Sequence, residues 1–299
     1  MPSGWGRSVV TIGVFDGVHR GHRQLIERAV EVGHERGLRS VVVTFDPHPA
    51  ELVRPGSHPA ALTTLERRAD LVAEIGADAF CVLPFTGELA RMDPAEFAHE
   101  VLVDTLHAAV VVVGTNFTFG HKAAGDLDTL RELGTRFGFQ VDGLDLITDD
   151  GVTFSSTYIR SCIDAGDMEA AAAALGRPHR VDGVVVHGDK RGRELGFPTA
   201  NVSCAAHTAL PADGVYAGWF LLGTRRLPAA VSVGSNPTFS GRVRTVEAFV
   251  LDVNEDFYGH EVGIEFAHRL RGMERYDGIE PLIAQMNADV ARTRELLGT

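Results

Sequence analysis

The sequence contains little of what marks a secreted or membrane-bound protein. Only three cysteines occur among 299 residues, and they lie far apart without a CxxC pair, so neither a disulfide framework nor a zinc site is indicated. The longest purely aliphatic run, residues 108–113, has six residues, far below the roughly 20 that cross a bilayer. A short apolar run near the start leads directly into Asp16, which does not suggest a signal peptide. We therefore expect a cytoplasmic protein with no membrane partner.

Positive charge is also scarce. The chain has 28 basic and 40 acidic residues, a formal net charge of −12, so no general field attracts a polyanion. Nucleic acid is therefore excluded as an expected partner. Only Lys122 and Lys190 supply lysine, and both lie in glycine-rich loops.

What the sequence does contain is two different periodicities, and its length suggests two domains at about 150 residues each. Residues 1–178 alternate β-branched runs with longer amphipathic segments, which predicts a Rossmann-like parallel sheet with helices. The expected strands are residues 8–14, 40–45, 79–83 and 108–113. The expected helices are residues 22–36, 63–75, 93–106 and 168–175, the last ending at Gly176-Arg177-Pro178.

Residues 179–299 change to short strands separated by Gly, Pro and Asn. The expected strands are residues 180–186, 214–221, 227–233, 245–251 and 261–270. Closely spaced strands without crossover helices predict an antiparallel barrel or sandwich. Apolar residues then recur at helical spacing and predict a final helix to residue 297.

The first motif, GVFDGVHRGH at residues 13–22, lies where the first strand ends and the first helix begins. Ligands of open α/β sheets bind there, and exposed amides at a helix start favour phosphate. The HxGH spacing puts His19 and His22 at i and i+3, where both can reach one ligand, and Gly21 lets that ligand approach the backbone. Two such donors can stabilise charge on a phosphorus without acting as nucleophiles. The alternative is a pair of surface histidines.

A second phosphate cradle is predicted at FSSTYIR, residues 154–160, where hydroxyls begin a helix and Arg160 follows one turn later. The alternative is a serine cap with a solvated arginine. Together with HxGH, the motif resembles the phosphate-binding pair of the class I nucleotidyltransferase superfamily.

Two loops, FDPHP at residues 45–49 and GTNFTFG at residues 114–120, end predicted strands at the same edge of the sheet. Their prolines and phenylalanines can form a slot for a planar ring, with Asn116 facing its polar atoms. The alternative is that the aromatic rings belong to the core.

In this order, FDGVHRGH, TFDPHP, GTNFTFG and SSTYIR resemble the FMN adenylyltransferase module of bacterial bifunctional riboflavin kinase/FAD synthetases. The resemblance implies that His19, His22 and Arg160 act on the ATP phosphates. It places further ATP contacts at Gly13, Phe15, Asp16, Gly17, Ser155, Ser156 and Thr157. It places flavin contacts at Pro47, Pro49, Asn116, Phe119 and Asp126, with Lys122 in the same closing loop.

The second half contains a basic, glycine-rich loop, HGDKRGRELGFPTAN at residues 187–201, that suits a flap over phosphates. Thr199 and Asn201, two apart in an extended chain, point the same way and form a weak Mg²⁺ site that nucleotide phosphates complete. In TVEAFVLD, residues 245–252, Glu247 shares a face with Phe249. Either Glu247 points inward or the strand is buried on both sides, and a general base for an alcohol is then one hypothesis. The alternatives are a solvated hairpin loop and an edge-strand glutamate.

These two segments, with GVYAG, SVGSNPTF and FYG, resemble the riboflavin kinase module of the same family. The resemblance implies a small β-barrel with a C-terminal helix in which Thr199 and Asn201 hold Mg²⁺ and Glu247 activates the ribityl hydroxyl. It places nucleotide contacts at Gly188, Lys190 and Gly192 and a flavin contact at Arg271.

The sequence therefore predicts a bifunctional enzyme of flavin cofactor biosynthesis that uses MgATP twice. Riboflavin and ATP would give FMN and ADP, and FMN and a second ATP would then give FAD and pyrophosphate. A homo-oligomer is compatible with this prediction. The alternatives are an adenylyltransferase for another acceptor such as phosphopantetheine, a chain with one inactive module, and a flavin-sensing protein without catalysis.

Overall fold

The structure is a computed structural model that describes residues 4–56, 58–149, 151–188, 196–238 and 241–299. The chain divides into two compact units. The first unit comprises Met1–Pro59 and Leu65–Ser155, and the second comprises Ala60–Thr64 and Ser156–Thr299. The division at residue 178 stays a prediction about where the two catalytic modules join.

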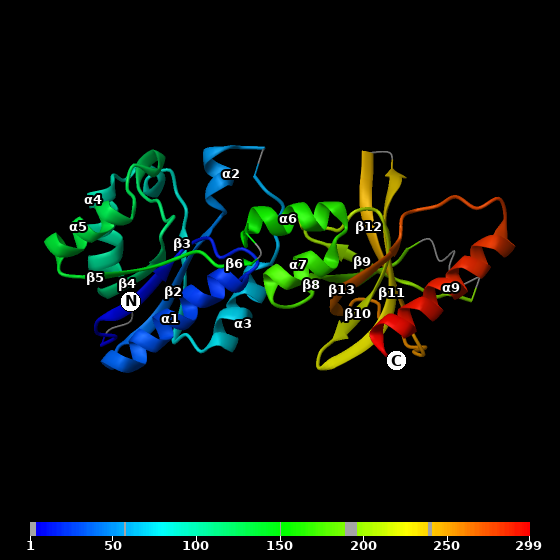
Figure 1. Cartoon of the computed structure of the whole chain (residues 1–299). Helices are drawn as coiled ribbons and strands as arrows, with labels where there is room; N and C mark the ends of the chain where they lie inside the picture. The colour runs from blue at the N-terminus through cyan, green and yellow to red at the C-terminus, as the bar shows by residue number, and fades with distance from the viewer. Residues whose placement is uncertain (1–3, 57, 150, 189–195, 239–240) are drawn as a thin grey trace. The chain divides into compact units, whose positions relative to one another are not determined.

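The first unit is built on a five-stranded parallel sheet in the order β3-β2-β1-β4-β5 (Figure 1). Its strands are β1 (Ser8–Ile12), β2 (Arg39–Asp46), β3 (Ala79–Pro84), β4 (Ala108–Gly114) and β5 (Gln140–Leu144), beside a small hairpin of β6 (Thr148–Asp149) and β7 (Val152–Thr153). Its helices are α1 (Arg20–Arg36), α2 (Pro49–Val53), α3 (Leu65–Ile75), α4 (Pro94–Glu96) and α5 (Leu127–Phe137), with the π-type helix η2 (Phe97–Thr105) and the short 3-10 turns η1 (Leu89–Arg91) and η3 (His121–Ala123).

Helices cover both faces of this sheet. On one face, α1 and α3 pack over Val9 and Val42, and on the other, η2 and α5 pack over Val10 and Val43. Alternate residues of a strand point to opposite faces of the sheet. Because helices cover both faces, every side chain of β1 is buried. The predicted Rossmann-like sheet is confirmed, and Asp93 forms a capping box with Glu96 at the start of α4. Strand β5 was not expected, because its QVDGL sequence has one β-branched residue and no apolar run; its residues are half-buried or exposed.

The second unit is a closed antiparallel barrel in the order β10-β11-β12-β9-β8-β13 (Figure 1). Its strands are β8 (His179–Val186), β9 (Ala200–Cys204), β10 (Gly214–Leu222), β11 (Arg225–Thr238), β12 (Gly241–Val250) and β13 (Glu261–Arg271). Its helices are α6 (Ser156–Ala165), α7 (Met168–Leu175) and α9 (Ile279–Leu297). The predicted antiparallel barrel and final helix are confirmed, and the unexpected strand is β9, a short one next to the glycine-rich loop.

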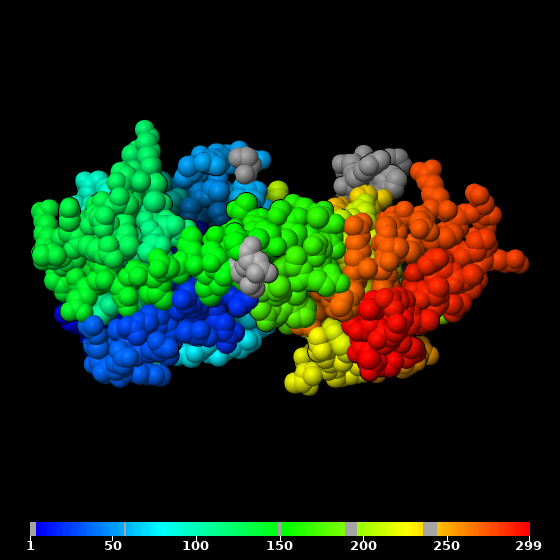
Figure 2. All heavy atoms as spheres, in the orientation of Figure 1, coloured from blue at the N-terminus to red at the C-terminus, as the bar shows by residue number. Residues whose placement is uncertain are grey.

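Helix α9 packs on the outside of the barrel against β10, β11 and β13. Figure 2 shows its red atoms at the surface of this unit. Its buried residues are polar, Asp289 and Thr293, although an amphipathic helix normally buries apolar side chains. Among the described residues, no helix is both long and apolar enough to cross a membrane.

Candidate active sites

The first candidate site is the turn between β1 and α1. His19 caps α1, and its Nδ1 accepts hydrogen bonds from the backbone N–H groups of Gly21 at 3.1 Å and His22 at 3.3 Å. An accepting Nδ1 fixes the neutral tautomer whose proton is on Nε2. The rings of His19 and His22 stack with centroids 3.6 Å apart. The two imidazoles therefore lie side by side, as the spacing predicts.

The same geometry corrects one expectation about this helix start. Helix α1 begins at Arg20, before the predicted start at His22, and two amides expected to face phosphate donate instead to His19. The His19 ring occupies the space above Gly21, since a Cβ on residue 21 would lie 3.1 Å from His19 Cε1. Gly21 therefore lets the His19 ring fold back over the backbone.

The residues before HxGH form a left-handed turn. Phe15 and Val18 have φ values of 51° and 38°, and Gly17 has 85°. Phe15 is 1% exposed, and Asp16 is buried as well. The ring of Phe15 lies over Gly13, where a Cβ would be 3.4 Å from its Cζ. The family resemblance places Gly13, Phe15, Asp16 and Gly17, but not Val18, around ATP.

Two residues that the sequence did not single out hold this turn. The Val14 carbonyl accepts a hydrogen bond from Thr44 Oγ1 at 2.8 Å and another from Arg68 Nη1 at 2.9 Å. Arg68 Nη2 also lies 3.5 Å from the Asp16 carboxylate. Arg68 lies on the face of α3 that buries Leu71 and Val72, so the helical period marks it as a charge on an apolar stripe, but no pattern reveals what its long side chain reaches.

The second predicted phosphate cradle is divided between the two units. Ser155 ends the first unit, whereas Ser156, Thr157 and Arg160 lie on α6 of the second. Arg160 Nε donates to the Ala60 carbonyl at 2.6 Å. That Arg160 joins His19 and His22 on one nucleotide stays a prediction.

The predicted flavin loops of the first unit follow β2 and β4, the two parallel neighbours of β1. Both loops and the HxGH turn therefore lie at the carboxyl edge of the sheet. Pro47 is exposed, Pro49 is the first residue of α2, and Asn116 is exposed beyond β4. These positions leave the three residues accessible to a ligand.

Two other members of the predicted flavin set have visible structural roles. Phe119 is 6% exposed and packs in the core against Phe97, with ring centroids 5.7 Å apart. Asp126 caps α5, where its Oδ1 accepts from the Thr129 amide at 2.9 Å, and this hydrogen bond lowers the pKa of the Asp126 carboxyl. Lys122 is exposed in the loop between them. Their contacts with a flavin stay predictions.

The second candidate site is a cavity of about 280 Å³ on the outer face of the barrel. It is lined by Phe197, Thr199, Val215, Ala230, Ser232, Glu247, Phe249, Arg271, Met273, Glu274, Tyr276, Leu282, Met286, Asp289 and Val290. Glu247 and Phe249 alternate along β12 with the buried Val246 and Ala248. Glu247 therefore does not point into the barrel: Val246 and Ala248 fill it, whereas Glu247 and Phe249 are half-buried and line this cavity.

Strand pairing positions the polar wall of the cavity. Glu247 lies opposite Asn201 of β9 on one side and opposite Ser232 of β11 on the other. Thr199 Oγ1 lies 3.4 Å from Glu247 Oε2, a long hydrogen bond. A hydroxyl, an amide and a carboxylate thus converge on one wall, and their oxygens are the ligands that Mg²⁺ prefers.

An ion pair lies at the other side of the cavity. Arg271 Nη2 and Nε bind the two carboxylate oxygens of Asp289 on α9 at 2.7 and 3.0 Å, and this pairing raises the pKa of Arg271. Gln285 Nε2 donates to the same carboxylate at 2.9 Å. Asp289 was not among the residues predicted from the sequence. This residue lies seven positions after Leu282, on the same apolar face of α9. A carboxylate on an apolar face indicates a buried partner of opposite charge.

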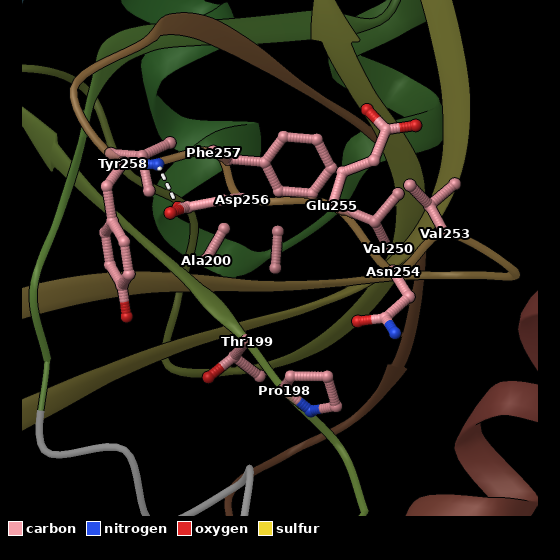
Figure 3. A pocket seen from close by; sticks show the side chains of 12 residues that line it. Pro198, Thr199, Ala200, Val250, Val253, Asn254, Glu255, Asp256, Phe257 and Tyr258 are labelled. Carbon is pink, nitrogen blue, oxygen red and sulfur yellow. Dashed lines mark hydrogen bonds between the residues drawn. The ribbon is translucent and has the colours of Figure 1, made fainter.

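A smaller pocket of about 50 Å³ adjoins Thr199 (Figure 3). Figure 3 shows Thr199 and Pro198 on one side and the segment from Asn254 to Tyr258 on the other, where the Tyr258 amide donates to Asp256. Thr199 lines both this pocket and the larger cavity. The two hollows therefore share a wall at one hydroxyl.

The predicted flap is described only at its two ends. Lys190 and Gly192 lie outside the described residues. At Gly188, an added Cβ would overlap the amide of Asn201. The absence of a side chain at residue 188 therefore gives Asn201 its place beside Glu247.

A histidine pair at a helix start on a parallel sheet, together with a barrel cavity whose wall carries a carboxylate and oxygen ligands, defines a two-part class of nucleotide-dependent transferase. Comparisons with known proteins identify the family. The FAD synthetase family model matches residues 2–158, and the riboflavin kinase family model matches residues 175–297. The chain belongs to the bifunctional riboflavin kinase/FMN adenylyltransferase family.

Relatives of this family match almost the whole chain. The bifunctional riboflavin kinase/FMN adenylyltransferase of Escherichia coli strain K12 is 36% identical over 97% of this chain and 93% of its own length. Those of Pseudomonas fluorescens and Bacillus subtilis are 38% and 33% identical over 96% and 95% of the chain, and 92% and 90% of their own lengths. A solved structure from Streptococcus pneumoniae, described as a macrolide-efflux protein, is 32% identical, has a TM-score of 0.89, and is matched over 97% of this chain and 94% of its own.

Proposed function

We propose that this chain carries out two successive ATP-dependent transfers, riboflavin to FMN in the barrel unit and FMN to FAD in the sheet unit. The family membership and the order of the two family matches support both activities. The observation that carries the kinase assignment is the approach of Thr199 to Glu247 in the wall of the barrel cavity, at 3.4 Å. We propose residue 178 as the boundary of the two catalytic modules.

The larger cavity suits a flavin. Phe249, Tyr276 and Met286 offer flat and apolar surface to the ring system, while Arg271 offers a charged donor. Glu247 then takes the proton of the terminal ribityl hydroxyl as that oxygen bonds to the γ-phosphorus of ATP, and ADP leaves with the bridging oxygen. No covalent intermediate on the protein is needed.

The smaller pocket suits part of the nucleotide, because Thr199 is the wall that it shares with the larger cavity. A phosphoryl group passing between the two hollows would cross at Thr199. Thr199 and Asn201 would hold the Mg²⁺ that accompanies ATP, with Gly188, Lys190 and Gly192 in the flap. The metal, when bound, neutralises phosphate charge.

The adenylyl transfer would take place at the HxGH turn. His19 and His22 donate to the ATP phosphates, and an FMN phosphate oxygen attacks the α-phosphorus as its bond to pyrophosphate breaks. Gly13, Phe15, Asp16 and Gly17 shape that turn. Ser155, Ser156, Thr157 and Arg160 are proposed as further phosphate contacts, and Pro47, Pro49, Asn116, Phe119 and Asp126 as flavin contacts.

We further propose a cytoplasmic location. Cys81, Cys162 and Cys204 are all unpaired, which suits a reducing compartment. Burial raises the pKa of each thiol, to about 11 for Cys204, so none is an activated nucleophile. Self-association is compatible with either reaction.

The proposal is tested by incubating the full chain with riboflavin, ATP and Mg²⁺ and separating the flavins by chromatography. FMN should form first and FAD should follow, with pyrophosphate released in step with FAD. Formation of neither flavin product would contradict the proposal. Retention of bound riboflavin without turnover would favour a flavin-sensing protein instead.

A further inference from the structure

The turn before the histidine pair is held in an unfavourable backbone conformation. Phe15 and Val18 both lie in the left-handed region, with φ values of 51° and 38°. Left-handed backbone is uncommon for any residue with a side chain and rare for a β-branched one. Such a conformation persists only where the surroundings determine it. The contacts of this turn therefore decide whether it keeps its shape.

Arg68 supplies several of these contacts at once. From α3, its Nη1 donates to the Val14 carbonyl at 2.9 Å and lies 3.2 Å from Thr44 Oγ1, while Nη2 lies 3.5 Å from Asp16. The side chains of Arg68 and Asp16 are 9% and 3% exposed. A planar guanidinium with several fixed donors can hold a carbonyl and a carboxylate together, which a lysine ammonium does less well.

The turn is connected to the catalytic histidines through Phe15. The ring of Phe15 is buried and meets the His22 ring edge-on, with centroids 5.2 Å apart and planes at 82°. His22 in turn stacks on His19 at 3.6 Å. A change in the turn that moved Phe15 would thus move the support of both imidazoles.

We propose that Arg68 is a positioning residue for adenylyl transfer: it holds the Val14–Val18 turn so that Phe15 fixes His22 and His19 against the phosphates. This inference rests on the proposed FMN adenylylation. Arg68 is buried and acts through the turn rather than on the substrate.

The test uses the full chain, because its kinase reaction monitors the other unit in the same sample. Arg68→Met should lower kcat for FAD formation from supplied FMN on the order of 100-fold, since small displacements of catalytic groups have effects of that size. FMN formation from riboflavin should stay within about twofold, because that reaction is assigned to the other unit. The matched control is Arg131→Met, which removes a half-exposed guanidinium paired with Asp128 on α5 and should leave both reactions within about twofold.

A second readout separates positioning from stability alone. Loss of positioning lowers kcat for FAD at temperatures well below the unfolding midpoint and leaves KM for FMN unchanged. If Arg68 only stabilised the fold, FAD formation per folded molecule would return to the wild-type value at those temperatures, which would overturn the proposal. Arg68→Lys, which keeps the charge without the planar fork, should recover part of the lost kcat and provides a variant with a smaller risk of misfolding.

A double-variant cycle tests the connection to Asp16. If both residues hold one turn, Arg68→Met combined with Asp16→Asn should reduce kcat for FAD no further than the more damaging single variant. If the two single effects on kcat multiply in the double variant, Arg68 and Asp16 do not act through one turn, and that part of the proposal is overturned. The proposed function fails separately: wild-type protein that makes no FAD contradicts FMN adenylylation itself, whereas Arg68→Met that makes FAD at the wild-type rate contradicts only the role of Arg68.

Discussion

The two candidate sites hold their polar groups by different structural means. At the HxGH site, the histidines follow a strained turn, and His19 caps the helix that begins there. The buried Arg68 donates to the turn, and the buried Phe15 packs against His22. At the barrel site the register of three adjacent strands places Glu247 between Asn201 and Ser232. The first site depends on backbone angles and the second on side chains presented by a regular ladder.

This difference has a consequence for substitutions. In a strand ladder, exchange of one side chain leaves the register intact, because the turns and the apolar pattern of the whole strand specify it. In a left-handed turn, a lost contact lets several residues relax together. The barrel site should therefore respond to substitution one group at a time, whereas the HxGH site should respond as a unit.

Glu247→Gln is expected to have the largest effect of the substitutions that follow. It keeps the size of the side chain and removes the proposed base, so FMN formation should fall on the order of 100- to 10,000-fold. FAD formation from supplied FMN should be unchanged, as followed by chromatography of each reaction. Glu261→Gln, an exposed glutamate at the start of β13, is the control. FMN formation close to the wild-type rate would remove Glu247 as the base and break the comparison.

His22→Ala should show the opposite selectivity. Loss of one proposed donor to the phosphates is expected to lower kcat for FAD formation about 100- to 1,000-fold. Riboflavin phosphorylation should remain at the wild-type rate. His34→Ala removes an exposed histidine from the last turn of the same helix and should affect neither reaction. Equal loss of both activities would mean that the two sites are not independent.

Parts of both sites could be predicted from the sequence, and the reason lies in their spacing. HxGH fixes two side chains within one helical turn, and alternation along β12 fixes the face of Glu247. Both relations are local, so a pattern reveals them. The helix start at Arg20 was missed because His19 caps with its ring, a role usually taken by Ser, Thr, Asp or Asn.

Long-range contacts could not be predicted in this way. Arg68 reaches the Val14 carbonyl across 54 positions of sequence, and no periodicity encodes that contact. Asp289 was detectable in part, because a carboxylate on the stripe of Leu282 and Met286 predicts burial. Its partner Arg271, however, is known only once α9 lies on the barrel.

Asp289→Asn is expected to have a moderate effect at the barrel site. It weakens the bidentate ion pair with Arg271, so the guanidinium loses its fixed orientation in the cavity. A charged hydrogen bond contributes about 1.5–3 kcal/mol, so a partial loss predicts a rise in KM for riboflavin of about tenfold. FAD formation from FMN should not change.

The control for that variant is Asp252→Asn. Asp252 also binds an arginine through both oxygens, Arg294 on α9, with distances of 2.8 Å, but it does so at an exposed position. It should leave KM for riboflavin unchanged. A similar rise in KM for riboflavin in both variants would mean that the effect comes from the packing of α9 on the barrel and not from Arg271.

The smallest expected effects come from a matched pair of glycines, one at each site. Gly188→Ala would displace the Asn201 amide and should lower FMN formation a few-fold, because that amide is the end of a flexible side chain and can move aside. Gly21→Ala would press on the His19 ring and should lower FAD formation a few-fold. Steady-state rates of both reactions in both variants give four values.

The two glycine variants should differ in stability even where their rates fall alike. Gly21 is helical, so alanine there favours the helix by about 0.5–1 kcal/mol and offsets part of the crowding at His19. Gly21→Ala is therefore expected to unfold at or above the wild-type temperature while making FAD more slowly. If both its unfolding temperature and its rate of FAD formation fell, the added methyl group would displace residues beyond His19, and the whole turn would change conformation. That result would strengthen the contrast with the barrel, where Gly188→Ala should move one side chain and leave the ladder in place.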